Sequence, residues 1–162
     1  RSRSRKGGPE VRSIAVHAFI GTALDRISEL AAAAGTDLVN AVDPDDVIKA
    51  DGDLLRIVLN NVLMNATSHA RAKCITVTSQ RKGHFYHLTI SDDGVGIAGP
   101  TLERIHEELE GRSGPVEETG RGAAVGLGFV IMAECMRTLN GTMNVESSAS
   151  GTRISVVLPG PR

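Results

Sequence analysis

The clearest pattern in the chain is a helical repeat of apolar positions between Asp53 and Ala70. Apolar residues recur there every three or four positions, which predicts a helix with one buried face. They are Leu54, Leu55, Val58, Leu59, Val62, Leu63 and Ala66. Asn61, Asn65 and His69 are spaced four residues apart, so the same helix carries a polar stripe beside its buried face.

Two further stretches have helical periodicity. One covers Phe19–Ala34 and ends at Gly35, a residue type that commonly caps the C-terminus of a helix. The other covers Gly126–Leu139, where an Asn-Gly pair ends it. A weaker helix is predicted at Leu102–Leu109, inside a polar stretch.

Alternation of apolar and polar residues predicts strands in much of the remaining chain. The alternating segments are residues 36–42, 73–80, 85–91, 142–147 and 152–158, and a short extended stretch covers 11–16. Polar turns at 81–84 and 148–151 join two pairs of these strands into hairpins, and residues 43–46 form another turn.

The order of these elements predicts the fold. It reads helix, strand, helix, hairpin, polar loop, helix, hairpin, without the strand–helix–strand rhythm of a dinucleotide-binding fold. Hairpins make neighbouring strands antiparallel. We therefore expect an α+β domain, a two-layer α/β sandwich with a mixed, largely antiparallel sheet of about five strands and three helices on one face.

Length and composition fit one domain. The chain has 162 residues, within the roughly 100–200 residues of a typical domain. We expect a flexible tail or linker at residues 1–10 and one domain at 11–160. Aromatic residues make up 2% of the chain and the net charge is −1, so neither base stacking nor a basic field favours a nucleic-acid partner.

The two cysteines, Cys74 and Cys135, lie in a predicted strand and a predicted helix among apolar neighbours. Both are predicted to be buried free thiols, which suits a reducing cytoplasm. The sequence has no signal peptide and no run of about 18 apolar residues, so this domain is expected to make no membrane contact. A cytoplasmic part of a membrane-anchored sensor fits the same features.

Two asparagines in register inside a helix need a reason, because an Asn amide competes for backbone hydrogen bonds. An amide oxygen is a neutral, hard ligand that suits Mg²⁺, the cation that accompanies nucleotide phosphates. The alternative is that these amides satisfy buried backbone groups. The helix alone favours neither interpretation.

Three glycine-containing motifs follow. In Ser91–Ile97 an acid at a strand end precedes Gly-x-Gly, which allows a tight turn against a flat ligand. Its carboxylate suits the exocyclic amino group of adenine. The Gly-Leu-Gly at 126–128 opens a predicted helix, where free N–H groups attract phosphate. A Gly-Thr pair at 151–152 leads into the last strand. Each motif alone also fits a simple turn or close packing.

In order and spacing these segments resemble the boxes of one family. LLRIVLNNVLMNATSHA is similar to the N box, SDDGVGI to the G1 box and AVGLGFVI to the G2 box, while NGTMNVESSASGTRISVVLP resembles the terminal hairpin. The chain thus resembles the ATP-binding catalytic domain of sensor histidine kinases. Their GHKL superfamily includes type II topoisomerases, the mismatch-repair ATPase and the heat-shock chaperone ATPase. The resemblance implies the Bergerat ATP-binding fold.

The resemblance implies ATP and Mg²⁺ as cofactors and assigns roles to residues. Asn61 and Asn65 would be the catalytic pair, with Mg²⁺ on Asn65 and Asn61 nearby. Asp92 would accept from the adenine amino group, supported through water by Thr152. The other implied ATP-binding residues are Ser68, His69, Gly94, Gly96, Ile97, Gly126, Leu127 and Gly128. Residues 98–124 correspond to a mobile ATP lid, since a long loop inside a compact domain is usually functional.

The chain departs from the family pattern in three places. Ser68 stands where a Lys or Arg is usual, so Arg71 or Arg121 is the candidate phosphate cation, unless each is a solvated surface charge. Ala124 replaces the first glycine of the G2 box, and IHEELEG replaces the aromatic F box of the lid. These changes suggest a divergent domain with weakened activity.

The position four residues before Asn65 favours a kinase. Hydrolytic relatives carry a Glu there as a general base for water, whereas Asn61 cannot take a proton. We expect transfer of the ATP γ-phosphate to a His on a separate dimerisation domain, in cis or in trans, with a response regulator as the next partner. Two alternatives remain, a degenerate nucleotide-binding module that regulates a partner and an anti-sigma-type serine kinase.

Overall fold

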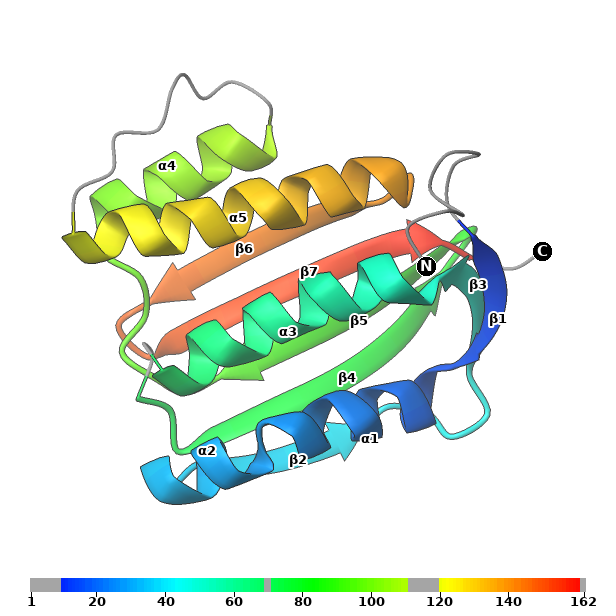
Figure 1. Cartoon of the computed structure of the whole chain (residues 1–162), viewed down its shortest axis with the longest axis horizontal. Coiled ribbons are helices and arrows are strands. Elements are labelled where there is room, and N and C mark those ends of the chain that lie inside the picture. Colours follow the sequence, from blue (N-terminus) through cyan, green and yellow to red (C-terminus); the bar gives the residue numbers. More distant parts are fainter. Residues whose placement is uncertain (1–9, 69–70, 111–119, 161–162) are drawn as a thin grey trace.

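The computed structural model describes residues 10–68, 71–110 and 120–160. Strands and helices are interspersed along the chain, often two of one kind in succession (Figure 1). Their bounds are β1 (Val11–Ala15), α1 (Val16–Arg26), α2 (Ser28–Ala34), β2 (Asp37–Ala41), β3 (Val47–Asp51), α3 (Gly52–Ser68), β4 (Cys74–Lys82), β5 (Phe85–Asp92), α4 (Gly99–Leu109), α5 (Gly120–Thr138), β6 (Thr142–Ser148) and β7 (Gly151–Pro159).

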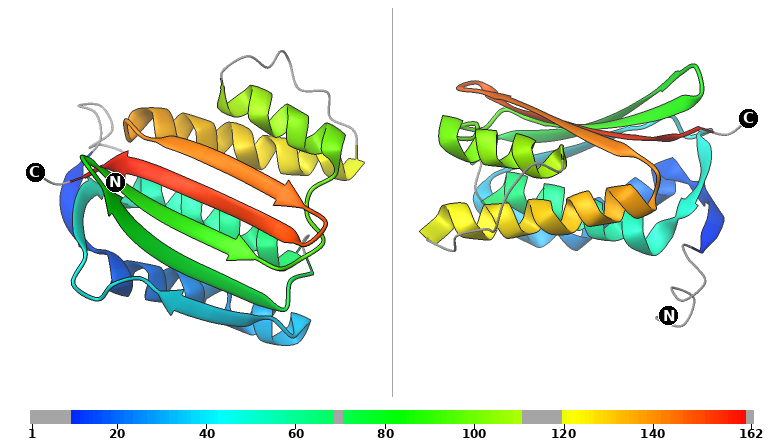
Figure 2. Two further views of the ribbon diagram at one scale, coloured as in Figure 1. Left: turned by 180° about the vertical axis from the view of Figure 1, so that it is seen from behind. Right: turned by 90° about the horizontal axis from the view of Figure 1, so that it is seen from above.

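The main sheet has five strands in the order β2-β4-β5-β7-β6. β2 and β4 are parallel, whereas the β4–β5, β5–β7 and β6–β7 pairs are antiparallel. The helices lie on one face of this sheet, with α4 beside the edge strand β6 (Figure 2). The expected two-layer α/β sandwich with a mixed, largely antiparallel sheet is confirmed.

The core lies between the sheet and the helices. In β5, Tyr86, Leu88 and Ile90 are buried and alternate with more exposed residues, as expected of a strand with one covered face. The buried face of α3 supplies Leu55 and Leu59, which have no exposed surface. This packing fixes the orientation of α3, and therefore the direction of its polar stripe.

The helix predicted at 19–34 is divided in two. α1 ends at Arg26 and α2 begins at Ser28, and Ile27 between them has φ −104° and ψ 6°. The Ser28 hydroxyl donates to the carbonyl of Asp25 over 2.9 Å, a local bond that competes with the helical ladder. Ile27 is buried and continues the apolar periodicity of the two helices. The sequence pattern therefore gives no sign that the helix is interrupted there.

One strand was absent from the prediction. β3 pairs antiparallel with β1, from Val11 opposite Asp51 to Ala15 opposite Val47, and the two form a separate small sheet. The extended stretch predicted at 11–16 is thereby confirmed as a strand. The sequence pattern did not predict β3, because the strand is short and its partner β1 lies far upstream. No local turn therefore indicates the pairing.

The helix predicted to begin at Gly126 begins at Gly120. The glycines at 126 and 128 therefore lie inside α5, and the prediction that they open the helix was wrong. α5 packs against α3 and α4, and such packing overrides the low helix propensity of glycine. Residues 98–124, the predicted lid, contain α4 and the start of α5, while 111–119 lie outside the described residues.

Two predictions about the whole chain can be compared with the structure. Neither Cys74 nor Cys135 forms a disulfide, but Cys135 is buried whereas Cys74 is only partly buried. Among the described helices, none has the length and apolar character that crossing a membrane requires.

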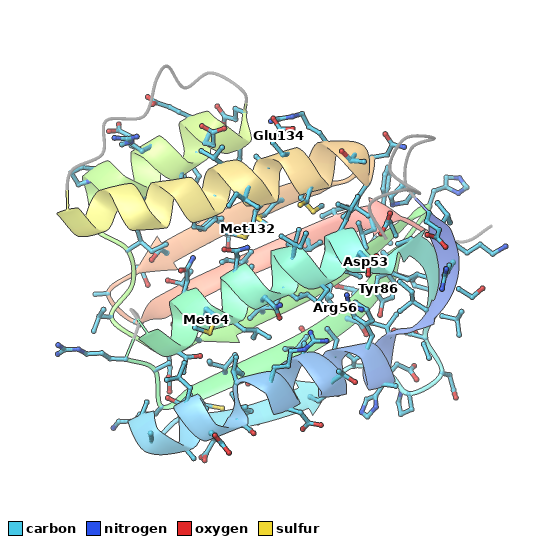
Figure 3. The ribbon with its side chains drawn as sticks, viewed as in Figure 1. Asp53, Arg56, Met64, Tyr86, Met132 and Glu134 are labelled. Atoms are coloured by element: carbon cyan, nitrogen blue, oxygen red, sulfur yellow. The ribbon has the colours of Figure 1, made fainter. Side chains whose placement is uncertain are left out.

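Several segments that are distant in sequence meet at one end of the molecule. The C-terminal end of α3, the ends of β5 and β6, and the starts of β7 and α5 lie together there (Figures 1 and 2). Asp53 and Met64 mark the two ends of α3, with Met64 toward this meeting point (Figure 3). We call this region the box end, because all four sequence boxes contribute to it.

Candidate functional site

The start of α3 is fixed by Asp51. One oxygen of its carboxylate accepts the backbone N–H groups of Asp53 at 3.0 Å and Leu54 at 3.2 Å. The other oxygen accepts the N–H of Glu10 over 2.8 Å. An N-terminal cap of this kind satisfies donors that a helix leaves free. It ties β1 to α3 and sets where the asparagines of α3 lie.

Asn61 faces the helix that carries the G2 box. Its amide nitrogen donates to the carbonyl of Ile57 over 2.8 Å, which directs the amide oxygen away from that bond. A Cβ placed on Gly128 of α5 would lie 3.4 Å from this oxygen. The N box and the G2 box are therefore in contact, and a glycine at 128 leaves room for the amide.

Asn65 has a buried amide nitrogen without a hydrogen-bond partner in the part of the chain that the structure describes. A buried donor left unsatisfied costs about 1–3 kcal/mol. A phosphate oxygen would accept from this nitrogen, and the amide oxygen of the same side chain suits Mg²⁺. The unsatisfied amide therefore fits a magnesium–phosphate group better than it fits a purely structural role.

Asp92 ends β5, opposite Thr152 of β7. Its carboxylate accepts the N–H of Gly94 over 2.9 Å. Burial raises the pKa of Asp92, the N–H groups of Gly94 and Thr152 oppose that rise, and Asp93 adds to it. A half-buried carboxylate held only by backbone donors keeps acceptor capacity for a ligand.

The neighbouring Asp93 is engaged differently. Its carboxylate accepts the backbone N–H groups of Lys73 at 2.8 Å and Cys74 at 3.0 Å. These two bonds, that of Cys74 first, lower the pKa of Asp93. Asp93 therefore joins the end of β5 to the start of β4, and it is a structural counterpart to Asp92.

Two glycines bring the loop after β5 against the β6–β7 hairpin. Gly96 has φ +82°, and a Cβ on it would lie 2.0 Å from the carbonyl oxygen of Ser148. Gly151 has φ +142°, and a Cβ there would lie 2.1 Å from the carbonyl oxygen of Asp92. A side chain at either position is excluded by conformation and by space. The G1 loop and the hairpin are thus in backbone contact.

Ser147 joins the same two segments and was not identified from the sequence. Its Oγ accepts the N–H of Ile97 over 2.7 Å and lies 3.0 Å from Oγ1 of Thr152. The only available signal was its position opposite Thr152 in the predicted hairpin. A serine near a turn is common enough that this signal carried no weight.

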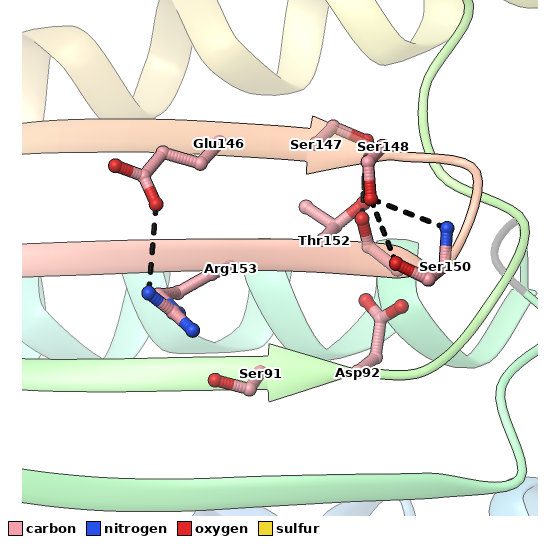
Figure 4. Close-up of a pocket in the computed structure, with 9 residues that line it drawn as sticks. Ser91, Asp92, Glu146, Ser147, Ser148, Ser150, Thr152 and Arg153 are labelled. Atoms are coloured by element: carbon pink, nitrogen blue, oxygen red, sulfur yellow. Dashed lines mark hydrogen bonds and ion pairs between the residues drawn. The ribbon is translucent and has the colours of Figure 1, made fainter.

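A hollow of about 270 Å³ opens beside these groups (Figure 4). Its lining includes Asp92, Ser147 and Thr152. The rim includes Arg153 and Glu146, whose charged groups are 3.6 Å apart. The hollow therefore lies beside the strand ends and the hairpin turn that carry the carboxylate and both hydroxyls.

Other predicted site residues are less defined. Arg71 follows α3, is exposed and has φ 55°, which is uncommon outside glycine. Ser68 ends α3, and Arg121, Gly126 and Leu127 lie in α5, but their side chains, like the whole of His69, lie outside the described residues. Within the described chain, no hydrogen bond joins the Asn61–Asn65 pair to the Asp92 cluster.

Residues 50–162 match the family model of histidine kinase-, DNA gyrase B- and HSP90-like ATPases. The chain belongs to this ATPase family. The sensor histidine kinase component HK1 of Mycobacterium tuberculosis H37Rv is 30% identical to it over 132 residues, 81% of this chain and 76% of HK1. The sensor histidine kinase CusS of Escherichia coli O6:H1 is 27% identical over 152 residues, 93% of this chain and 31% of CusS.

A solved structure shares the fold of this ATPase family member. The catalytic domain of the histidine kinase ThkA, in a nucleotide-free form, has a TM-score of 0.77 to it at 19% identity, covering 93% of this chain and 96% of ThkA's. The chain spans about a third of the length of CusS. The expected identification is confirmed: the chain is an ATP-binding catalytic domain of the histidine kinase type.

Proposed function

We propose that this domain binds ATP with Mg²⁺ at the box end and transfers the γ-phosphate to a His on a separate dimerisation domain. The observation that carries the proposal is the amide nitrogen of Asn65, which is buried without a hydrogen-bond partner among the described residues. Asn61 lies one helical turn before Asn65, and its amide oxygen lies against Gly128. The same end of the molecule holds Asp92, whose half-buried carboxylate is bound, among the described residues, by backbone donors.

The adenine is proposed to lie beside Asp92. Its amino group would donate to the carboxylate, and the glycine-constrained loop at Gly94 and Gly96 would present flat backbone to the base. Thr152 would act through a water in the hollow. Ile97, next to Gly96, would complete this side of the pocket.

The phosphates are proposed to lie between α3 and α5. Asn65 would hold Mg²⁺ and donate to a phosphate oxygen, with Asn61 beside it. Bound Mg²⁺ would supply neutralisation of the charge that develops on the transferring phosphoryl group. Because α5 begins at Gly120, Gly128 would act by leaving space next to Asn61, and not as part of a first helical turn.

The acceptor is proposed to be on another domain, although one histidine here has a suitable neighbour. His106 precedes Glu107 on the amphipathic helix α4. Its Nε2 is bonded at 2.8 Å to the carbonyl oxygen of Val145 on the edge strand β6, so this ring is engaged. Purified domain incubated alone with labelled ATP should therefore stay unlabelled.

The relatives support a partner in either arrangement. This domain is about a third of CusS, which leaves most of that sensor kinase for other domains, but it matches 76% of HK1, a protein named as a kinase component. We propose a dimerisation domain in cis or in trans and a response regulator that receives the phosphoryl group. We also propose that the domain works in the cytoplasm, with ATP.

The proposal is tested by calorimetric titration of the wild type, Asp92→Ala and Asp93→Ala with ATP, with and without Mg²⁺. We expect Asp92→Ala to lose detectable ATP binding, because a buried amino group of the base would be left unpaired. Asp93→Ala is the matched control, since the hydrogen bonds of its carboxylate within the described residues go to the backbone at the start of β4. A folded Asp92→Ala domain with wild-type affinity would refute the site.

A transfer assay separates this function from its alternatives. The domain, a histidine-bearing dimerisation domain and labelled ATP should give acid-labile, base-stable label on the partner. Binding without transfer would favour a regulatory module, which Ser68 and Ala124 suggested at the outset. Label that survives acid on a serine of a partner would instead indicate an anti-sigma-type kinase.

A further inference from the structure

We infer that Ser147 is a positioning residue that fixes the direction of the hydrogen bonds around Asp92, and that it makes the site select adenine over a purine with the opposite edge. The inference rests on the proposed function, because it requires a purine beside Asp92. Ser147 is half-buried and lies at the centre of a cluster that joins the G1 loop to the β6–β7 hairpin.

Three groups surround the Ser147 hydroxyl. The N–H of Ile97 lies at 2.7 Å, Oγ1 of Thr152 at 3.0 Å and the carbonyl oxygen of Gly151 at 3.4 Å. The amide N–H can only donate, so it occupies a lone pair of Ser147. The carbonyl can only accept. The single hydroxyl proton of Ser147 therefore goes either to Thr152 or to Gly151.

The distances decide between these two arrangements. Hydroxyl hydrogen bonds to oxygen are usually about 2.7–2.8 Å long and weaken as they lengthen. At 3.0 Å Thr152 is the better acceptor, and Gly151 at 3.4 Å is the poorer one. In the inferred arrangement Ser147 donates to Thr152, which leaves the proton of the Thr152 hydroxyl free to point at a ligand or at a water.

The cluster then offers one acceptor and one donor side by side. Asp92 accepts, and Thr152 donates directly or through one bridging water. Adenine has the complementary edge, with an amino donor at position 6 and an acceptor at N1. Hypoxanthine has an acceptor at position 6 and a donor at N1, so both contacts are reversed.

Ser147 also holds the loop that shapes the pocket. Gly96 lies so close to the hairpin that no side chain fits between them, and the next N–H in the chain, that of Ile97, is the one that Ser147 accepts. Without the hydroxyl this N–H loses its partner, and the Thr152 proton loses its fixed direction. Both losses act on recognition of the base and not on the phosphate contacts of α3.

The test compares ATP with inosine triphosphate, which differs only at this edge of the base. Dissociation constants are measured by calorimetry, with inosine triphosphate as a competitor where binding is weak. We expect the wild type to prefer ATP by at least about a hundredfold. Ser147→Ala should weaken the affinity for ATP about tenfold and change the affinity for inosine triphosphate less than about threefold. The preference for ATP therefore becomes smaller. Ser147→Thr, which keeps the hydroxyl, should restore it.

Ser148→Ala is the matched control, because among the described residues that exposed hydroxyl forms hydrogen bonds only with Ser150 of the same turn. Thr152→Val removes the other end of the proposed bond, so adding Ser147→Ala to it should cause little further loss. If Ser147→Ala does not fold, the single variant Thr152→Val is compared with the wild type in its place. Equal weakening of both nucleotides, or none, would overturn the inference. A wild type that binds neither nucleotide would instead contradict the proposed function.

Discussion

Two carboxylates lie at opposite ends of the molecule and are held in opposite ways. Asp46 precedes β3 and accepts the hydroxyl of Tyr86 over 2.7 Å and that of Ser79 over 2.8 Å. Asp92 ends the strand that Tyr86 nearly begins, about 20 Å away at the usual rise per residue. Within the described chain, the hydrogen bonds to Asp92 come from backbone N–H groups, those of Gly94 and Thr152.

The surroundings of Asp46 are closed by the protein itself. The Arg81 guanidinium lies 5.4 Å from the centre of the Tyr86 ring and 4.0 Å from the Asp46 carboxylate. Burial, together with the bond to Asp46, raises the pKa of Tyr86, although Ser79 and Arg81 act in the opposite direction. Every strong group in this cluster has a side-chain partner, so the cluster needs no ligand.

The comparison shows what distinguishes a ligand site from a structural cluster in this domain. Both ends contain a partly buried acid, but among the described residues only the box end leaves hydrogen-bonding capacity unused, at Asp92 and at the amide nitrogen of Asn65. A buried polar group without a hydrogen-bond partner lowers the stability of the fold. Such a group is expected where a bound ligand compensates for that loss. Changes at the two ends should therefore separate stability from binding.

The largest effect is expected for Asp46→Ala. The change leaves the buried hydroxyl of Tyr86 and that of Ser79 without their acceptor, so the free energy of unfolding should fall by about 2–4 kcal/mol. ATP affinity at the distant box end should change less than about twofold. Chemical denaturation and calorimetry measure the two quantities. Asp45→Ala, at an exposed position next in sequence, should change neither.

Asn65→Leu is expected to change the free energy of unfolding in the opposite direction. Leucine removes the buried amide that has no partner in the described chain, so the free energy of unfolding should rise by about 1–2 kcal/mol. Binding of ATP with Mg²⁺ should be lost. Asn60→Leu, on the same helix, measures the gain from helix propensity alone. If Asn65→Leu is no more stable than Asn60→Leu, the amide is satisfied in solution and the comparison fails.

Much of this arrangement could be predicted from the chain. The apolar repeat of α3 gave the buried face and the polar stripe, because a helix with one covered side has a strong period. The alternation in β5 and β7 similarly gave the hairpin strands. The start of α5 could not be predicted, because glycine indicates a helix end locally, and only packing against α3 and α4 keeps it inside the helix.

Within the site, the sequence identified groups by their type but not by their contacts. Asp92, Asn61 and Thr152 were assigned through a family resemblance, and the contact between Asn61 and Gly128 supports the pairing of their boxes. Ser147 was missed because its importance comes from a bond to Ile97, fifty positions away. No periodicity records an approach of that kind between a loop and a hairpin.

The smallest effect concerns Arg71, whose φ of 55° a non-glycine residue adopts at a cost. Glycine adopts it freely, so Arg71→Gly should raise the free energy of unfolding by about 0.5–1 kcal/mol. If the guanidinium serves the phosphates in place of Ser68, ATP affinity should fall about tenfold. Denaturation and calorimetry again give the two values.

Two companion variants separate backbone from charge at this position. Arg71→Ala keeps the unfavourable φ and removes the cation, so it should bind ATP as weakly as Arg71→Gly without becoming more stable. Arg71→Lys keeps a positive charge and should retain most of the affinity. If all three variants bind ATP like the wild type, Arg71 is only a solvated residue at the end of α3, and the unused capacity of the box end reduces to its amide and its carboxylate.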